Sequence, residues 1–282
     1  MDVNSIAQML PDAPQVLYKY RRWDKLVNED DFHRNILTKK ELYYSSPDEL
    51  NDPYDINIKL NFNALSMDKR VHYYFNILKK NPNNYLRFSK NNSSLSYESQ
   101  LYEDIWINRK MLTDDFMSKM AQQQILMIRD ATKIFCLSES ETTNRMWSSY
   151  SNSHTGYCIG FKTANLFFKG CGMIPKVNYY KEMPDIIPTD NFNNNADILI
   201  QMTYKNIEWE NEMEYRFIKI DKKDRIINFS SEDVAEIVLG YKMQAKQKEE
   251  IIDLCKKEFP NVPICQIEMD PRKYFLNKAR IK

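Results

Sequence analysis

The sequence predicts an α+β protein, with a mixed α/β order as the alternative, and three observations support this prediction. Short aromatic and β-branched segments typical of strands are concentrated after residue 132. Residues 64–130 are polar and carry apolar residues at helical spacing. A helical pattern at 246–259 stands between two strand-like segments. We therefore expect both kinds of element within a single domain covering residues 1–282.

The elements of the N-terminal half are expected in a definite order. The first 63 residues predict a short helix, a strand at 17–20, a helix at about 30–38 and an aromatic strand at 42–45. Ser46-Pro47-Asp48 is a turn or a helix start, and Asn51-Asp52-Pro53 is a turn. Residues 64–130 are predicted to be a helical insertion, with a long loop at 81–97.

The C-terminal half is expected to be rich in strands. In chain order, strands are predicted at 133–138, 155–161, 176–180, 212–220, 236–239 and 264–268. The helix at 246–259 is expected to turn four apolar residues toward the sheet: Ile251, Ile252, Leu254 and Cys255.

Glycine is unusually scarce, with 5 residues in 282, where average usage predicts about 20. The sequence contains no GxGxxG, no GxxxxGK[ST] and no GxSxG. These absences exclude a classical Rossmann turn and a P-loop, and they argue against an α/β-hydrolase. A nucleotide would therefore have to be bound by side chains. The five positions are Gly156, Gly160, Gly170, Gly172 and Gly240.

Charge and cysteine content suggest a cellular setting. Lys+Arg number 40 and Asp+Glu 39, so the basic excess typical of a dedicated nucleic-acid binder is missing. Five cysteines without a CxxC motif favour a reducing cytoplasm over a disulfide framework. The three histidines lack ligand-like spacing, so no metal is expected. No signal peptide and no run of ~18 apolar residues is visible, so no membrane is expected as a partner.

The strongest candidate for chemistry is the segment WENEMEYRF at 209–217. On a strand, alternate side chains share a face, which would group Glu212, Glu214 and Arg216 at steps of about 7 Å. Neighbouring carboxylates raise each other's pKa, and Arg216 would lower it again. Such a group could stabilise a developing cation or orient a sugar hydroxyl. A solvent-exposed strand face with a simple ion pair fits the same pattern.

A second candidate joins YKYRRW at 18–23 with LYYSSPDELNDPYD at 42–55. The rings of Tyr18 and Tyr20 could stack on a flat base, and Arg21 could donate to phosphate or ribose oxygens. The tyrosines could equally be ordinary strand residues. Ser45 and Ser46 could donate to the same oxygens. Residues 51–55, with Asn51 and Asp52, are too polar to be core and form either a plain turn or a turn that also presents side chains to a ligand.

A third candidate is MWSSYSNSHTGYCIGF at 146–161. Trp147 and Tyr150 are one helical turn apart, and His154 stands just before a strand-like run. No spacing here commits to a catalytic triad, which also needs an orienting acid. His154 is more simply explained as a capping or hydrogen-bonding residue.

Together these segments resemble an uncharacterised bacterial family, the domain-of-unknown-function family 2971. The resemblance implies no activity, because none is attached to that family. It excludes residues 64–130 and is carried by 17–21, 41–55, 135–140, 146–161 and 209–218.

The chain order also resembles ADP-ribosyltransferases, in particular the toxins that modify thymidine in DNA. The matching pieces are 18–20, 36–46, 212–218, 237–240, 246–259 and 264–268. This resemblance implies a split sheet, mixed or antiparallel, that binds NAD without a glycine-rich loop. Two departures stand out: the first motif has a tyrosine in place of a histidine, and the middle Ser-Thr-Ser pattern has no secure match.

The resemblance implies roles for particular residues. In transferases with two acids on the late strand the second is catalytic, which maps to Glu214, with Glu212 as its helper. Their role would be to polarise the nicotinamide ribose and stabilise an oxocarbenium-like transition state. The residues expected to contact NAD are Tyr18, Tyr20, Arg21, Ser45, Ser46, Asn51, Asp52, Trp147, Tyr150 and Arg216.

We therefore expect an ADP-ribosyltransferase-like enzyme that uses NAD as a substrate, as a toxin or anti-phage effector acting on nucleic acid or protein. One alternative is a non-enzymatic sensor or interaction module on the same fold. The other is a metal-dependent nuclease in which Asp48, Asp52 and Asp55 bind Mg²⁺.

Overall fold

The computed structural model describes residues 13–24, 31–80, 96–169, 175–188, 200–220 and 224–281. The chain divides into two compact units, each of which is described by itself. Unit 1 comprises Met1–Leu50, Ala131–Lys181 and Lys205–Lys282. Unit 2 comprises Asn51–Asp130 and Glu182–Tyr204. The predicted N-terminal helix lies outside the described residues.

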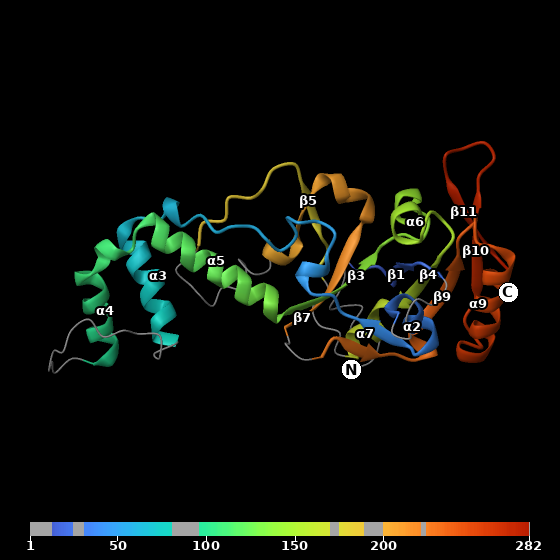
Figure 1. The fold of residues 1–282 in the computed structure, drawn as a ribbon, viewed down its shortest axis with the longest axis horizontal. Coiled ribbons are helices and arrows are strands. Elements are labelled where there is room, and N and C mark those ends of the chain that lie inside the picture. Colours follow the sequence, from blue (N-terminus) through green and yellow to red (C-terminus); the bar gives the residue numbers. More distant parts are fainter. Residues whose placement is uncertain are drawn as a thin grey trace. The chain divides into compact units, whose positions relative to one another are not determined.

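Unit 1 is built on a large sheet whose strands come from both ends of the chain (Figure 1). Its strands are β1 (Val16–Arg21), β3 (Thr132–Ser138), β4 (Tyr157–Lys162), β7 (Glu214–Ile220), β9 (Val234–Leu239), β10 (Ile264–Met269) and β11 (Leu276–Arg280). Over the described residues they form a seven-stranded sheet in the order β11-β10-β9-β4-β1-β3-β7. β9 and β10 are parallel and every other neighbouring pair is antiparallel, so the predicted mixed sheet of an α+β protein is confirmed.

Two short sheets accompany the large one. One pairs β2 (Glu41–Tyr43) with β8 (Ile226–Asn228), and the other pairs β5 (Asn178–Tyr180) with β6 (Tyr204–Asn206). Short 3-10 helices lie at η1 (Pro47–Glu49), η5 (Ile207–Glu212) and η6 (Ser231–Asp233). Ser46 begins η1 with a capping box that includes Glu49, which agrees with the helix start predicted there.

Helices cover both faces of the large sheet. Opposite residues of paired strands point to the same face, so alternation along β1 places Leu17 on one face and Tyr18 on the other. The first face packs on α2 (Phe32–Thr38), α7 (Thr163–Phe168) and α9 (Ala245–Glu258). The second packs on α6 (Asn144–Tyr150), whose Trp147 is fully buried.

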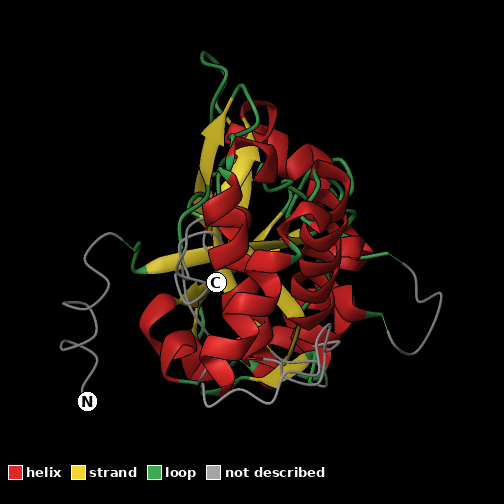
Figure 2. Cartoon of the chain, turned by 90° about the vertical axis from the view of Figure 1, so that its left-hand side faces the viewer, coloured by secondary structure: helices red, strands yellow, loops and turns green. Residues whose placement is uncertain are grey.

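Unit 2 is mainly helical and has its own apolar core. Its helices are α3 (Met67–Lys80), α4 (Tyr97–Ile107) and α5 (Asp114–Ala131), with 3-10 helices at η2 (Phe62–Ala64) and η4 (Arg109–Met111). Val71, Leu101 and Leu112 are fully buried in this core. The helices predicted within 64–130 are therefore present, and unit 2 also takes in residues 182–204. Figure 2 distinguishes the helices, in red, from the strands, in yellow.

The strands and helices predicted from periodicity agree with the structure to within a few residues. The exception that matters for function is the strand expected at 212–220, which begins at Glu214 instead. Glu212 ends the 3-10 helix η5, so it does not share a strand with Glu214. The short strands β6 and β8 and the edge strand β11 were not predicted from the sequence.

Candidate functional site

A cavity of about 50 Å³ lies in unit 1 beside the junction of β1 and β3. These strands share a single register pair, Tyr18 with Ser138, whereas β1 and β4 share six. Both faces of β1 and of β3 contribute to the lining, which places the cavity between the two strands and not over one face. It is lined by Tyr18, Lys19, Tyr20, Arg21, Cys136, Leu137, Ser138, Met146, Tyr150, Glu212 and Glu214.

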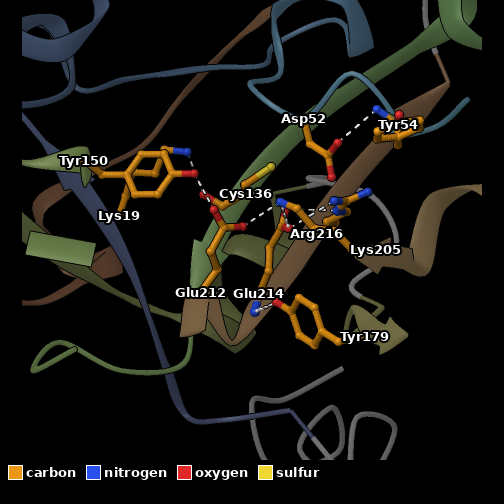
Figure 3. A network of polar contacts seen from close by, with 10 residues as sticks. All are labelled: Lys19, Asp52, Tyr54, Cys136, Tyr150, Tyr179, Lys205, Glu212, Glu214 and Arg216. Atoms are coloured by element: carbon orange, nitrogen blue, oxygen red, sulfur yellow. Dashed lines mark hydrogen bonds and ion pairs between the residues drawn. The ribbon is translucent and has the colours of Figure 1, made fainter. Parts of the chain in front are cut away.

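The acidic wall of the cavity is part of a buried network of ion pairs (Figure 3). Lys205 Nζ lies 2.5 Å from Glu212 Oε2 and 3.0 Å from Glu214 Oε2. Arg216 donates from two nitrogens to Glu214, Nε to Oε1 at 2.9 Å and NH2 to Oε2 at 3.0 Å. The Tyr150 hydroxyl donates to Glu212 Oε1. All four charged side chains are buried, so the solvent-exposed strand face allowed by the pattern is wrong.

The two glutamates differ in their acidity. Burial alone would raise the pKa of Glu214, but Arg216 and Lys205 hold it well below its usual range. Burial raises the pKa of Glu212, and Lys205 offsets this only in part while Glu214 adds to it. The site thus holds one carboxylate kept ionised and one that takes up a proton more readily.

A local turn brings the two acids together. Met213 ends η5 with φ 43° and ψ 53°, a left-handed conformation that is uncommon for a residue other than glycine. This residue redirects the chain from η5 into β7, which lets the carboxylates on either side of it reach Lys205. Glu139 N–H donates to the Met213 carbonyl at 2.9 Å, and Tyr179 accepts from Glu214 N–H at 2.9 Å.

The part of the cavity lining that comes from β1 includes two basic residues, Lys19 and Arg21. Lys19 Nζ donates to the Cys136 carbonyl at 2.7 Å, and its ammonium lies 4.9 Å from the centre of the Phe135 ring. Burial first, and Arg21 second, lower the pKa of Lys19 to about 7. Burial also lowers the pKa of Arg21 to about 10. The basic side chains therefore lie where a positive charge is poorly solvated.

The hydroxyl groups of Tyr18 and Tyr20 form hydrogen bonds with residues that do not line the cavity. Tyr18 OH donates to Glu236 at 2.8 Å, and Tyr20 OH donates to the Ser140 carbonyl at 2.8 Å. The Tyr18 ring crosses Gly160, where an added Cβ would lie 2.9 Å from the ring. One of the few glycines thus makes room for a tyrosine that lines the cavity.

The structure brings together six of the residues predicted to form the site. These are Tyr18, Tyr20, Arg21, Tyr150, Glu212 and Glu214. Arg216 lies directly behind Glu214. Trp147 does not line the cavity; its indole N–H donates to the Glu141 carbonyl at 2.7 Å and its ring packs edge-on against Tyr20.

Ser45 and Ser46 lie elsewhere in unit 1. Ser45 pairs with Ile134, four residues along β3 from Ser138, which is about 13 Å at the rise of a strand. Ser46 Oγ accepts from Arg225 at 2.8 Å. Neither serine lines the cavity.

The aspartates and Asn51 follow in the next stretch of chain. Asp52 and Asp55 are buried, although their segment looked too polar for a core. Asp52 Oδ1 accepts from Tyr54 N–H at 2.9 Å, as in a side-chain-supported turn (Figure 3). Asn51 and Asp48 are exposed. Across the described residues, no three His, Cys, Asp or Glu side chains gather so that they could hold a metal ion.

Lys205, Lys19 and Cys136 belong to the site but were not predicted. Lys205 lies on β6, which has no periodic signal, and its position depends on η5 folding back beside β7. Lys19 stands between Tyr18 and Tyr20, two predicted site residues, and this position could have indicated that Lys19 also belongs to the site. Cys136 lies opposite Arg216 on β3, and burial raises the pKa of its thiol.

Chemically, the lining of the cavity offers two carboxylates of unequal acidity, two basic side chains and three phenol rings. The cavity has room for three to five water-sized groups, since a water needs about 10–15 Å³ by this measure. That is comparable with a tetrahedral oxyanion or part of a sugar, and much smaller than the roughly 300–1,000 Å³ of a typical ligand pocket.

Comparison with known proteins adds one finding. A family model described as "Protein of unknown function (DUF2971)" matches residues 146–217. This stretch contains Tyr150, Glu212 and Glu214, so the matched region overlaps the acidic wall of the cavity. No curated protein and no solved structure matches the chain. Within the described part of the chain, no helix is both long and apolar enough to cross a membrane.

Proposed function

We propose that this protein is an ADP-ribosyltransferase-like enzyme that uses NAD and modifies a nucleic acid or a protein. One observation carries the proposal. Residues of the first strand and of the late acidic segment line one cavity, although all of unit 2 lies between them in the sequence. The resemblance to such transferases predicts that these two segments belong to the same site.

The chemistry would divide between the two acids. In the transfer, the bond from the ribose C1′ to nicotinamide breaks and nicotinamide leaves with the bonding electrons. Glu214, kept ionised by Arg216 and Lys205, would stabilise the cationic ribose through its charge. Glu212, whose pKa is raised, would accept the proton lost by the attacking group.

The size of the cavity sets a condition on this proposal. About 50 Å³ admits the reacting part of NAD at most. Binding of the whole dinucleotide therefore requires lining side chains to move apart, and Tyr150 and Met146 of α6 are the lining residues that do not belong to the sheet or to η5.

The test is NAD turnover by the purified protein, with calorimetry of NAD and ADP-ribose binding. Glu212→Gln and Glu214→Gln are each expected to lower turnover by about 100-fold or more. Glu210→Gln is the matched control, because Glu210 is an exposed residue of the same 3-10 helix. Circular dichroism checks that each variant is folded, which matters most for Glu214→Gln because it leaves Arg216 buried without its carboxylate. Unchanged turnover in both folded variants would refute the site, and failure of NAD and ADP-ribose to bind would refute the proposal.

A non-enzymatic binding module on the same fold is the second candidate. Both oxygens of Glu214 are already held by Arg216 and Lys205, which leaves it poorly placed to make a new hydrogen bond. Micromolar binding of ADP-ribose without any turnover of NAD would favour this candidate.

A further inference from the structure

Arg21 is a buried cation that has no ion-pair partner among the described residues. Its side chain is almost inaccessible, with 8% of the residue exposed. Its Nε has no hydrogen-bond acceptor, and its NH1 makes one long contact of 3.4 Å with the carbonyl of Tyr20. Among the described residues no carboxylate comes within ion-pair distance of it. The exposed neighbour Arg22, by contrast, pairs with Asp24 at 3.4 Å.

Within the described residues, the other groups near Arg21 offset its charge only in part. The guanidinium carbon lies 5.3 Å from the centre of the Phe32 ring, a cation–π contact that supplies no negative charge. The negative charge of Asp31 acts on Arg21 without forming an ion pair with it, and the Asp31 carboxylate caps α2 by accepting from His33 N–H. Burial, together with Arg21 and two further basic residues, lowers the pKa of His33 to about 3, as expected in a positive environment.

Burial of a guanidinium without a counter-charge lowers the stability of the folded protein, because no ion pair offsets the hydration free energy that the charge loses. Buried charges in proteins are therefore normally paired. Lys19, two residues earlier on the same strand, adds a second cation to the cavity and donates to a backbone carbonyl only. Glu212 and Glu214 offset the charge of Lys19 only in part, because both already form ion pairs with Lys205 and Glu214 also pairs with Arg216.

From this arrangement we infer that the basic end of the cavity binds an oxyanion of the phosphate class, held by Arg21 with Lys19 as the second cation. The volume of about 50 Å³ fits a single tetrahedral group of this kind. Arg offers several N–H donors to such an anion in one plane. The inference rests on the proposed function only for the source of the anion, which is either the pyrophosphate of a dinucleotide or free phosphate.

Calorimetry with inorganic phosphate, pyrophosphate and ADP-ribose tests the inference, in chloride buffer at constant ionic strength. We expect the wild type to bind pyrophosphate or phosphate, and Arg21→Gln to weaken that binding by about tenfold or more. Arg22→Gln is the matched control, with a change of less than about twofold expected because Arg22 is exposed. Arg21→Lys, which keeps the charge but loses the planar donors, is expected to give an intermediate Kd.

Thermal unfolding provides a readout independent of activity. Pyrophosphate should raise the Tm of the wild type and of Arg22→Gln, but not that of Arg21→Gln. Without anion, Arg21→Gln should be at least as stable as the wild type, because it removes an unpaired buried charge.

The outcomes separate this inference from the proposed function. If ADP-ribose binds equally well to the wild type and to Arg21→Gln, the inference is overturned while the NAD proposal stands. If phosphate or pyrophosphate binds through Arg21 but NAD and ADP-ribose do not bind, the inference is supported and the NAD proposal fails. If no phosphate-class anion binds at millimolar concentration, the inference is overturned.

Discussion

At the scale of single residues, side chains that are close in sequence differ in pKa, burial and ion pairing. Glu212 and Glu214 are separated by one residue, yet burial raises the pKa of the first while ion pairs lower that of the second. On β1 and directly after it, Arg21 and Arg22 are adjacent, but Arg21 is buried with no ion pair to any described residue, whereas Arg22 is exposed and pairs with Asp24. Composition and spacing cannot predict such differences, because they depend on which side chains the fold places beside each charge.

Lys19 gives a pH-dependent prediction for stability. Its pKa is about 7 in the folded protein, against about 10.4 in an unfolded chain. Between these values the unfolded state binds more protons, so stability rises with pH across this range, and the cost of burying the charge is greatest at pH 7 and below. Lys19→Met removes that cost, so we expect it to raise the unfolding free energy by about 1–2 kcal/mol at pH 6 and by progressively less toward pH 9.

Urea denaturation at pH 6, 7.5 and 9 measures this trend. Three groups near Lys19 keep their protonation state over this pH range. Arg21 remains charged below pH 9, the Cys136 thiol stays protonated because its pKa is raised, and Glu214 stays ionised. Lys162→Met, at an exposed position on β4, is the control and should change stability by less than about 0.5 kcal/mol at each pH. A constant difference between Lys19→Met and the wild type at all three pH values would contradict the prediction.

At the scale of elements, two glycines lie where neighbouring backbone segments approach the sheet most closely. An added Cβ at Gly156 would lie 2.2 Å from the carbonyl oxygen of Arg21, and one at Gly240 would lie 2.1 Å from that of His154. His154 ends a run of three left-handed residues with φ of 50°, 54° and 71°. Glycine is therefore required where β1, the turn after α6 and β9 approach one another most closely.

Substitution of these glycines should give graded effects. Gly156→Ala clashes with backbone, so we expect the unfolding free energy to fall by about 3 kcal/mol or more. Gly160→Ala meets side-chain atoms at 2.9 and 3.0 Å, which can shift, so a smaller loss of about 1 kcal/mol is expected. Urea denaturation compares the two variants, and an equal loss in both would show that backbone contact is not the cause.

The elements themselves were largely predictable, and their junctions were not. Strand-like aromatic and apolar residues predicted β1 and β3, alternation predicted β7, and apolar residues on one side predicted the helix α9. Within β7 the prediction also grouped Glu214 with Arg216 correctly. Glu212 was placed wrongly because nothing in the residue type of Met213 signals a left-handed turn. Lys205 could not be predicted, since its partners depend on that turn.

At the scale of the whole molecule, the two units have separate apolar cores. The core of unit 2 is formed by residues from 62 to 121, and the cores on the two faces of the large sheet belong to unit 1. The lining of the cavity comes from unit 1. Loss of packing in unit 2 should therefore leave the residues of the site in place.

Leu101→Ala tests this separation. Leu101 is fully buried on α4, so its truncation should cost about 2–5 kcal/mol within unit 2. Hydrogen exchange measured by mass spectrometry should then speed up in α3, α4 and α5 while β1 and β4 keep their protection. Glu103→Ala, an exposed change on the same helix, should leave exchange unaltered. Comparable deprotection of β1 and β4 in Leu101→Ala would show that the cores are not separate.

The position of β1 in a sheet completed by distant strands has a consequence during synthesis. Lys19 meets Cys136 across 117 positions of sequence, and β4, the other neighbour of β1, follows later still. At about 5–20 residues per second, the ribosome needs roughly 7–28 s between completing β1 and completing β4. For that time β1 is an unpaired strand in the nascent chain, where exposed strands tend to aggregate. Positive charge is present along β1 and directly after it, at Lys19, Arg21 and Arg22. The cations that later line the cavity therefore also counter aggregation of β1 until its neighbouring strands have been synthesised.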